Sequence, residues 1–138
     1  MREILFRGKT KGNVTIKDGL FVFGLPFYEN GVVCGIETID GKLYRVDPET
    51  IVQYTGLKDK NGKKIFEGDI HENVHNGLLF VACFGAYFDT EYKIDVYGWY
   101  WKCPSNGHIS GFSGYEHCYA NIIGNVHDNP ELLEGNND

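Results

Sequence analysis

The stretch that decides the fold runs from Val46 to Ile70 and reads VDPETIVQYTGLKDKNGKKIFEGDI. Its opening, Asp47-Pro48, predicts a type I turn in which proline supplies the fixed φ of the second position. An alternative is a single helical turn, capped by Asp47 and starting at Pro48. Residues 50–55 come next, with β-branched and aromatic side chains that are typical of a strand.

The second half of this stretch predicts a turn and a returning strand. Asn61-Gly62 favours a two-residue type I′ hairpin, because both residue types tolerate positive φ. Residues 65–70 then form a strand in which Gly68 makes a bulge or bend. Such corners are what small barrels need, so a strongly bent, partly closed sheet is the expected architecture.

Turn-forming residue pairs like Asn61-Gly62 recur along the chain. Six Asx-Gly pairs are present: Asp18-Gly19, Asn30-Gly31, Asp40-Gly41, Asn61-Gly62, Asn76-Gly77 and Asn106-Gly107. Most are flanked by short runs of β-forming residues, at 14–16, 20–23, 32–33, 36–39, 42–46 and 78–81. Repeated short strands between turns predict a mostly-β domain, either a bent antiparallel sheet or a partly closed β-barrel.

Only the end of the chain predicts a helix. Asn129 can cap it, Pro130 suits its first position, and Glu131 complements the positive end of the helix dipole. Leu132 and Leu133 would then plug an opening in the sheet. Residues 134–138 are polar and are expected to fray.

Three of these segments together resemble one family. They are residues 46–70, the ending IGNVHDNPELL at residues 123–133, and the charged, alternating opening of residues 1–7. In these segments the chain resembles the YopX-like family of phage and prophage proteins. The chain departs from the family at His71, where an aliphatic residue is usual, and this leaves the burial of position 71 open. The resemblance implies origin and fold rather than a particular reaction.

Composition predicts one ordered, soluble domain over residues 1–138. The hydrophobic share is 42% and aromatic residues make up 14%, as in a globular core, while 18 glycines accompany many turns. A domain of this size hides roughly two-thirds of its unfolded surface. The charged start, Arg2 and Glu3, excludes an ordinary signal peptide, and no apolar run is long enough for a membrane helix. The expected location is the cytoplasm of a bacterial host.

Charge is distributed unevenly along the sequence. Residues 1–64 hold 11 Lys or Arg against 8 Asp or Glu, whereas residues 65–138 hold 2 against 11, which together give the net charge of −6. A net acidic chain disfavours nucleic acid as a partner unless its basic residues form a separate face. Such a face is offered by the basic turn, defined as Lys58, Lys60, Lys63 and Lys64, so a nucleic-acid-associated phage regulator is the alternative function.

Cofactor and metal motifs are weak. No glycine-rich phosphate-binding motif opens a helix, so no nucleotide cofactor is expected. Cys103, His108, His117 and Cys118 include ligand types that zinc favours, but the adjacent His117 and Cys118 would point to opposite faces of a strand. All four cysteines are expected to be reduced and unligated in the cytoplasm, and no metal site is predicted.

Glu67 and Asp69 offer the third possibility, a small metal-dependent enzyme. Placed at i and i+2 on one strand, two carboxylates share a face and can hold a divalent ion or move protons. A solvent-facing polar edge, with Asp69 accepting from backbone amides at the Gly68 bend, is the favoured interpretation. The candidate binding residues are Tyr54, Lys58, Lys60, Lys63, Glu67 and Asp69.

The aromatic run at residues 97–101 is the most specific surface candidate. Alternation places Tyr97, Trp99 and Trp101 on one face of a strand. Such a face can stack bases or sugars, but it is more typical of a core or of an oligomer interface. The resemblance to phage and prophage proteins implies an accessory protein, and the aromatic face favours one that acts by binding, as a homo-oligomer through these residues or on an unidentified phage or host protein.

Overall fold

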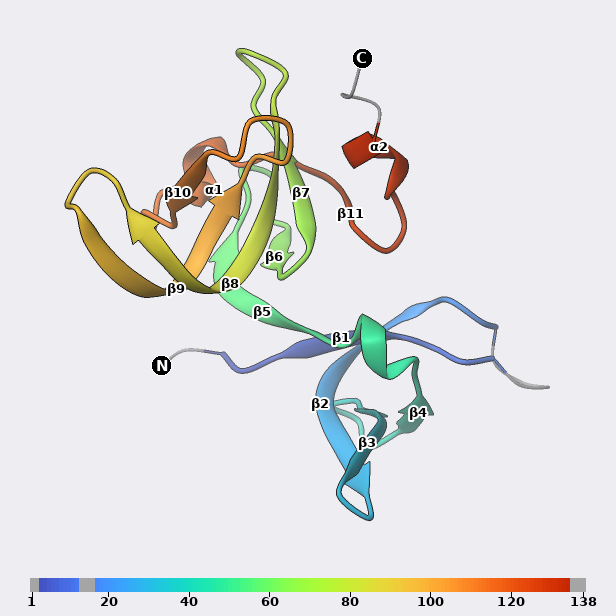
Figure 1. Ribbon diagram of the computed structural model, residues 1–138. Coiled ribbons are helices and arrows are strands. Elements are labelled where there is room, and N and C mark those ends of the chain that lie inside the picture. The colour runs from blue at the N-terminus through green and yellow to red at the C-terminus, as the bar shows by residue number, and fades with distance from the viewer. Residues whose placement is uncertain (1–2, 13–16, 135–138) are drawn as a thin grey trace. The chain divides into compact units, whose positions relative to one another are not determined.

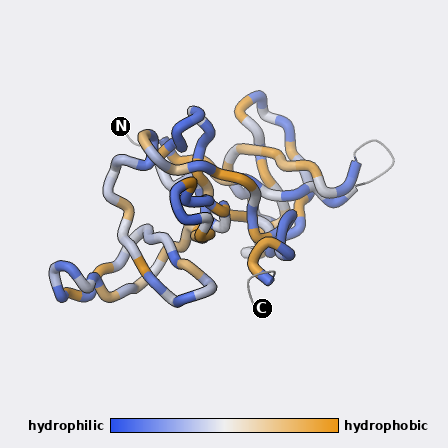
Figure 2. Tube along the Cα trace, turned by 90° about the horizontal axis from the view of Figure 1, so that it is seen from above, coloured by the Kyte–Doolittle hydropathy of each residue, from blue (hydrophilic) through white to orange (hydrophobic). Residues whose placement is uncertain are grey.

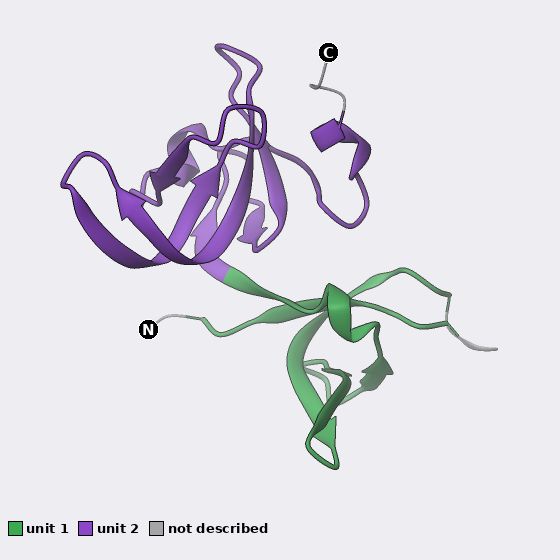
Figure 3. Ribbon diagram, in the orientation of Figure 1, with its two compact units in different colours: residues 1–54 green, residues 55–138 purple. Residues whose placement is uncertain are grey.

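The computed structural model describes residues 3–12 and 17–134, and strands dominate these residues (Figure 1). The chain divides into two compact units, residues 1–54 and residues 55–138 (Figure 3). The single domain expected for residues 1–138 stays a prediction, because this division does not show whether the units unfold together. Within the described ranges, no helix has the length and apolar character needed to cross a membrane.

Unit 1 is an antiparallel sheet. Its elements are β1 (Phe6–Lys9), β2 (Phe21–Glu29), β3 (Val32–Glu37), β4 (Leu43–Arg45), the 3-10 helix η1 (Pro48–Thr50) and the first part of β5 (Val52–Lys58). The strands lie in the order β4-β3-β2-β1-β5. Ile36, Val46 and Tyr54 are its buried apolar residues, at 0–5% exposure. Buried Arg7 lies against the Phe21 ring, with Cζ 4.4 Å from the ring centroid.

Unit 2 contains the rest of β5 and a second sheet. Its further elements are β6 (Lys64–Phe66), β7 (Asp69–Glu72), β8 (Leu79–Asp89), β9 (Ile94–Lys102), β10 (Ile109–Gly111), α1 (Glu116–Tyr119), β11 (Ile122–Asn125) and α2 (Glu131–Glu134). β6 lies next to β5, and the second sheet has the order β10-β9-β8-β7-β11. The core cluster is Ile65, Ala82, Trp101, Ala120 and Ile122, with Phe80 and Phe112 packed against it. Hydrophobic and hydrophilic stretches are interspersed along the trace (Figure 2).

The expectation of a mostly-β antiparallel fold is confirmed, but the partly closed barrel is wrong. Both sheets are open: among the described residues, β4 and β6 are the outer strands of one, and β10 and β11 of the other. The strand predicted over residues 65–70 ends at Phe66, and Gly68, with φ of 88°, turns the chain into the next sheet. The bend at Gly68 therefore separates two sheets rather than curving one of them.

The Asx-Gly turns have the expected glycine geometry and mostly a different turn type. All six glycines have positive φ, but of the six Asx residues only Asn30 does, with φ of 53°. Asn30-Gly31 therefore forms the type I′ turn between β2 and β3. At Asn61-Gly62 the two-residue hairpin is wrong: the Gly62 N–H donates to the Asp59 carbonyl at 3.0 Å, and the Asp59 N–H donates to Lys63. The reason is that the Asp59 carboxylate binds the turn amides from inside.

We expect Gly62→Val to lower the free energy of unfolding by about 1–2 kcal/mol, because a β-branched residue is strained at positive φ. Gly62 has φ of 80° and open space around its Cβ position, so the cost is conformational and not a clash. Gly98→Val is the matched control, since Gly98 also has open space but not a positive φ. Urea denaturation measures both. An equal loss in the two variants would contradict the turn geometry.

The helical expectations hold in part. The single helical turn is confirmed over the type I turn, because Asp47 caps η1 by accepting from the Glu49 N–H at 3.1 Å. α2 begins at Glu131, directly after Pro130, and Leu132 and Leu133 are half-buried. α1 was not predicted. The predictions for residues 1–2, the strand at 14–16 and the fraying of 135–138 lie outside the described residues.

Candidate functional site

Hydrogen bonds to the buried Asp59 hold the basic turn in unit 2. Lys58, Lys60 and Lys63 are exposed, whereas Lys64 is half-buried in β6. Asp59, only 2% exposed, lies beneath them, and its Oδ1 accepts from the backbone N–H groups of Asn61 and Lys63, both at 2.9 Å. Its Oδ2 accepts from the Ile122 N–H at 3.2 Å, which ties the turn to β11. Sequence reasoning missed Asp59, although an Asp just before Asn-Gly favours this local hydrogen bonding.

The paired carboxylates do not share a strand face. Glu67 lies in the turn between β6 and β7 and is half-buried, which raises its pKa above the usual value. Asp69 is 1% exposed at the start of β7, and its Oδ2 accepts from the Phe66 N–H at 2.8 Å. The i, i+2 geometry is therefore wrong. Of the favoured interpretation, the solvent-facing edge is wrong, because Asp69 is buried, whereas the hydrogen bond that Asp69 accepts from a backbone amide at the Gly68 bend is confirmed.

The three aromatic side chains on one face of β9, Trp101, Trp99 and Tyr97, range from buried to exposed. Trp101 is 2% exposed and stacks on Phe112, with ring centroids 4.6 Å apart. Trp99 is half-buried, and Tyr97 is 74% exposed. The shared face is confirmed, but its three residues have different roles, because only Trp101 reaches the layer where helix α1 and β11 cover the sheet.

The outer half of the β8–β9 hairpin is the half nearer to its loop, residues 83–99. It carries four aromatic side chains on one face. We call Phe84, Phe88, Tyr97 and Trp99 the outer aromatic face. Phe84 pairs with Trp99 across the strands, and the Phe84 ring meets the rings of Trp99 and Tyr97 edge-on at 4.7 and 5.3 Å. Phe84 and Phe88 are 44% and 50% exposed. Sequence reasoning missed both phenylalanines, although their spacing at i and i+4 in a strand-forming run puts them on one face.

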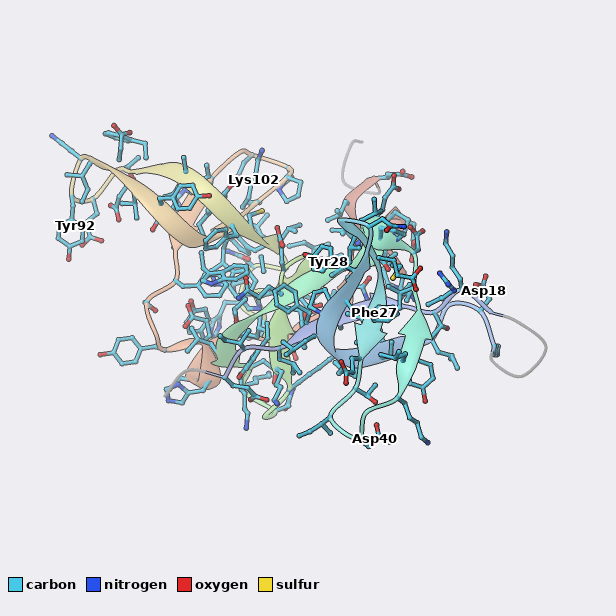
Figure 4. All side chains as sticks on the ribbon, turned by 90° about the horizontal axis from the view of Figure 1, so that it is seen from below. Asp18, Phe27, Tyr28, Asp40, Tyr92 and Lys102 are labelled. Atoms are coloured by element: carbon cyan, nitrogen blue, oxygen red, sulfur yellow. The ribbon has the colours of Figure 1, made fainter. Side chains whose placement is uncertain are left out.

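Backbone pairing with the neighbouring strands stops short of this outer half. β7 pairs with β8 only at Leu79–Val81, and β10 pairs with β9 only at Tyr100–Lys102. Among the described residues, 83–89 and 94–98 pair only with each other, so both edges of the ribbon are open. Figure 4 shows Tyr92, which is 70% exposed, at the far end of this hairpin.

His71 lies in β7 of unit 2. The sequence left open whether this position is buried, and the structure shows that it is. It is only 3% exposed, and its Nδ1 accepts from the Asn121 N–H at 2.8 Å. Its ring contacts Phe80, Trp101 and Tyr119, with centroid distances of 6.0, 5.3 and 5.7 Å. Burial is the main cause that lowers the pKa of His71. The nearby Lys60 charge acts in the same direction, and Asp59 and Glu116 oppose it.

We expect the protein to lose stability as the pH falls from 7.5 to 5.5, and His71 to cause part of that loss. The unfolded histidine takes up a proton near pH 6.5, whereas the folded one resists it, so the unfolded state binds more protons in this range. The free energy of unfolding, from urea denaturation at both pH values, should depend less on pH in His71→Gln. The exposed His127→Gln variant should keep the wild-type dependence, and equal dependence in all three proteins would exclude His71 as the cause.

The cysteine and histidine residues considered for zinc are not gathered into a site. Cys103 is buried with its Sγ 3.2 Å from the Ser105 hydroxyl, whereas Cys118 is exposed on α1. His108 and His117 are both exposed. Across residues 3–12 and 17–134, no three His, Cys, Asp or Glu side chains are grouped so that they could hold a metal ion.

Tyr54 is the remaining candidate. It is 5% exposed in β5 and belongs to the core of unit 1, so its ring is packed inside and not offered to a ligand. Of the candidate binding residues, Lys58, Lys60 and Lys63 are therefore at the surface, Glu67 is half-buried, and Tyr54 and Asp69 are buried.

Comparison with known proteins gives one result. A family model described as YopX protein matches residues 13–134, which is nearly the whole chain. No curated protein matches this chain. The match includes two of the three segments that carry the resemblance, residues 46–70 and 123–133, and it leaves out the opening at residues 1–7. This chain belongs to the YopX family.

Proposed function

We propose that this protein is a phage- or prophage-encoded accessory protein of the bacterial cytoplasm that acts by binding, with a second copy of the chain as its partner. The observation that carries the proposal is the outer aromatic face. Four aromatic side chains lie on one side of a ribbon whose two edges are open. Aromatic residues are the usual anchors of protein interfaces.

The stability of the hairpin supports this choice. A two-stranded ribbon is marginal in water unless a third strand or another apolar layer covers it. Residues 83–98 include such a ribbon, and its exposed aromatic face adds apolar surface that water disfavours. A second copy offers the same ribbon, so a two-fold symmetric contact between the two aromatic faces would cover both of them.

The uneven distribution of charge along the sequence contributes less to self-association than the sequence suggested. Unit 1 holds 7 Lys or Arg and 7 Asp or Glu, whereas unit 2 holds 6 against 12, so the lysines of the basic turn belong to the acidic unit. Unit 1 is then neutral and unit 2 carries −6. Opposite patches on the two units therefore do not steer assembly, and the apolar face is the main source of affinity.

Sedimentation equilibrium between 1 and 100 μM tests the proposal. We expect wild type to be a reversible dimer, and Phe88→Ser plus Tyr97→Ser to be a folded monomer. Tyr28→Ser is the matched control, because Tyr28 is a 64% exposed strand tyrosine of unit 1. A wild type that stays monomeric at 100 μM would overturn self-association. A double variant that stays dimeric would move the interface elsewhere.

Nucleic acid remains the second candidate, supported by the three exposed lysines above the Asp59 anchor. Binding through them would weaken steeply with salt, since each phosphate contact releases counterions. Retention of single- or double-stranded DNA at 150 mM salt, lost on changing Lys58, Lys60 and Lys63 to Gln, would favour this function over self-association.

A further inference from the structure

Two adjacent hollows open beside His71 in unit 2. The first, the ring hollow, has a volume of about 170 Å³ and is lined by His71, Asn73, Phe80, Trp101, His108, Ser110 and Tyr119. The second, the lysine hollow, has a volume of about 180 Å³. His71, Asn73 and Tyr119 line both, so the two hollows are direct neighbours.

The ring hollow has the size and walls for one planar ring. A cavity of about 150 Å³ is enough to bind benzene. Aromatic rings form its walls: Phe80 is nearly parallel to the His71 ring, with an interplanar angle of 27°, and Tyr119 meets that ring edge-on at 67°. A further ring in this space would stack or pack edge-on against them, as aromatic pairs prefer.

His71 provides a directed hydrogen-bond donor. Its Nδ1 already accepts from Asn121, so in the neutral imidazole the proton is on Nε2. Among the residues that the structure describes, none forms a hydrogen bond with Nε2. A 3% exposed histidine that lines both hollows and leaves one N–H unused is suited to an acceptor on a ligand.

The lysine hollow adds a positive charge. Lys60 and His75 line it together with Val74 and Cys118. The Lys60 backbone is held in place because its N–H donates to the Ala120 carbonyl at 2.9 Å. In the described part of the chain, no Asp or Glu lines either hollow, so Lys60 is the charge that an anionic group would meet there, while the buried Asp59 and Glu116 act on His71 in the opposite sense.

We propose that these hollows form a binding site for a small molecule made of one planar ring and one anionic group. The ring lies in the ring hollow against Phe80 and Trp101. The anion lies in the lysine hollow, where Lys60 pairs with it and the His71 Nε2–H donates to it or to the ring. The chemistry fits a pyrimidine nucleoside monophosphate or an aromatic carboxylate, and this site is separate from the outer aromatic face.

Amide chemical-shift titration of the full ¹⁵N-labelled chain tests the site. The probes are uridine 5′-monophosphate and 4-hydroxyphenylacetate, with uridine as the ring without an anion and ribose 5-phosphate as the anion without an aromatic ring. We expect saturable shifts at Asn121 and Asn73 with a Kd below about 1 mM for at least one complete probe, within the usual affinity per ligand atom. Binding of one complete probe and not the other identifies the source of the ligand.

Lys60→Gln and Lys58→Gln form a matched pair, because both lysines are exposed on the same turn and only Lys60 lines the hollow. We expect Lys60→Gln to weaken the complete probe about fivefold to tenfold and to leave uridine unchanged, as loss of one partly desolvated charge pair does. Lys58→Gln should bind as wild type does. The proposal is overturned if neither complete probe saturates by 10 mM, if uridine binds as tightly as its monophosphate, or if both variants lose affinity equally.

Discussion

Replacing Asp59 with alanine is expected to destabilise the protein by about 3–5 kcal/mol, because it removes a buried acceptor of several backbone N–H groups. One carboxylate, 2% exposed, accepts three backbone hydrogen bonds, from Asn61, Lys63 and Ile122. The contact with Ile122 is buried and joins residues 63 positions apart. Alanine would leave all three N–H groups without this acceptor, and the buried Ile122 N–H cannot turn to water instead.

Asp89→Ala is the matched control for this prediction. The Asp89 carboxylate also accepts two backbone N–H groups, from Glu91 and Tyr92, but in an exposed turn. Its loss should cost less than about 1 kcal/mol, because water replaces the acceptor. Urea denaturation compares the two variants. Similar losses would show that the Ile122 contact and the burial of Asp59 do not stabilise the fold.

Trp101→Ala is expected to cost about 3–5 kcal/mol, the range for removing a large aromatic side chain from a core. Trp101 stacks on Phe112 and contacts His71, and it belongs to the cluster that holds β8 and β9 against Ala120 and Ile122. The cavity left behind would be bordered by the rings of His71 and Phe112.

Tyr97→Ala provides the comparison, since Tyr97 lies on the same face of β9 and is 74% exposed. Under dilute, monomeric conditions its loss should cost less than about 1 kcal/mol, as at other exposed sites. Thermal unfolding at about 1 μM and at 100 μM separates stability from assembly. A large loss for Tyr97→Ala at the lower concentration would mean that the outer aromatic face is packed within one chain.

Local sequence rules predicted the turns and strands well where one residue type decides the backbone. Each glycine of the Asx-Gly pairs has positive φ, because glycine adopts it without a steric penalty. The same rules assigned the wrong turn type at Asn61-Gly62, where the Asp59 side chain, and not the strand twist, sets the geometry. Closure of the barrel was wrong for a similar reason, since the path of the chain after the Gly68 bend depends on distant partners, β8 and β11.

The alternation of side chains along a strand predicted which residues of the candidate site share a face. It did not predict which of them are buried. Period two placed Tyr97, Trp99 and Trp101 on one face, but burial along that face depends on where α1, β10 and β11 end. His71 shows the same limit. Its departure from an aliphatic residue was visible in the sequence, whereas its hydrogen bond with Asn121, 50 positions away, results only from the pairing of β7 with β11.

The most direct test of binding through the outer aromatic face is a dilution series of ¹H–¹⁵N spectra from 500 to 10 μM. We predict concentration-dependent shifts or line broadening at residues 84–88 and 94–99, with the amides of Lys58, Lys60 and Lys63 unchanged. Spectra that do not depend on concentration, or changes confined to residues outside the β8–β9 hairpin, would contradict the proposed function.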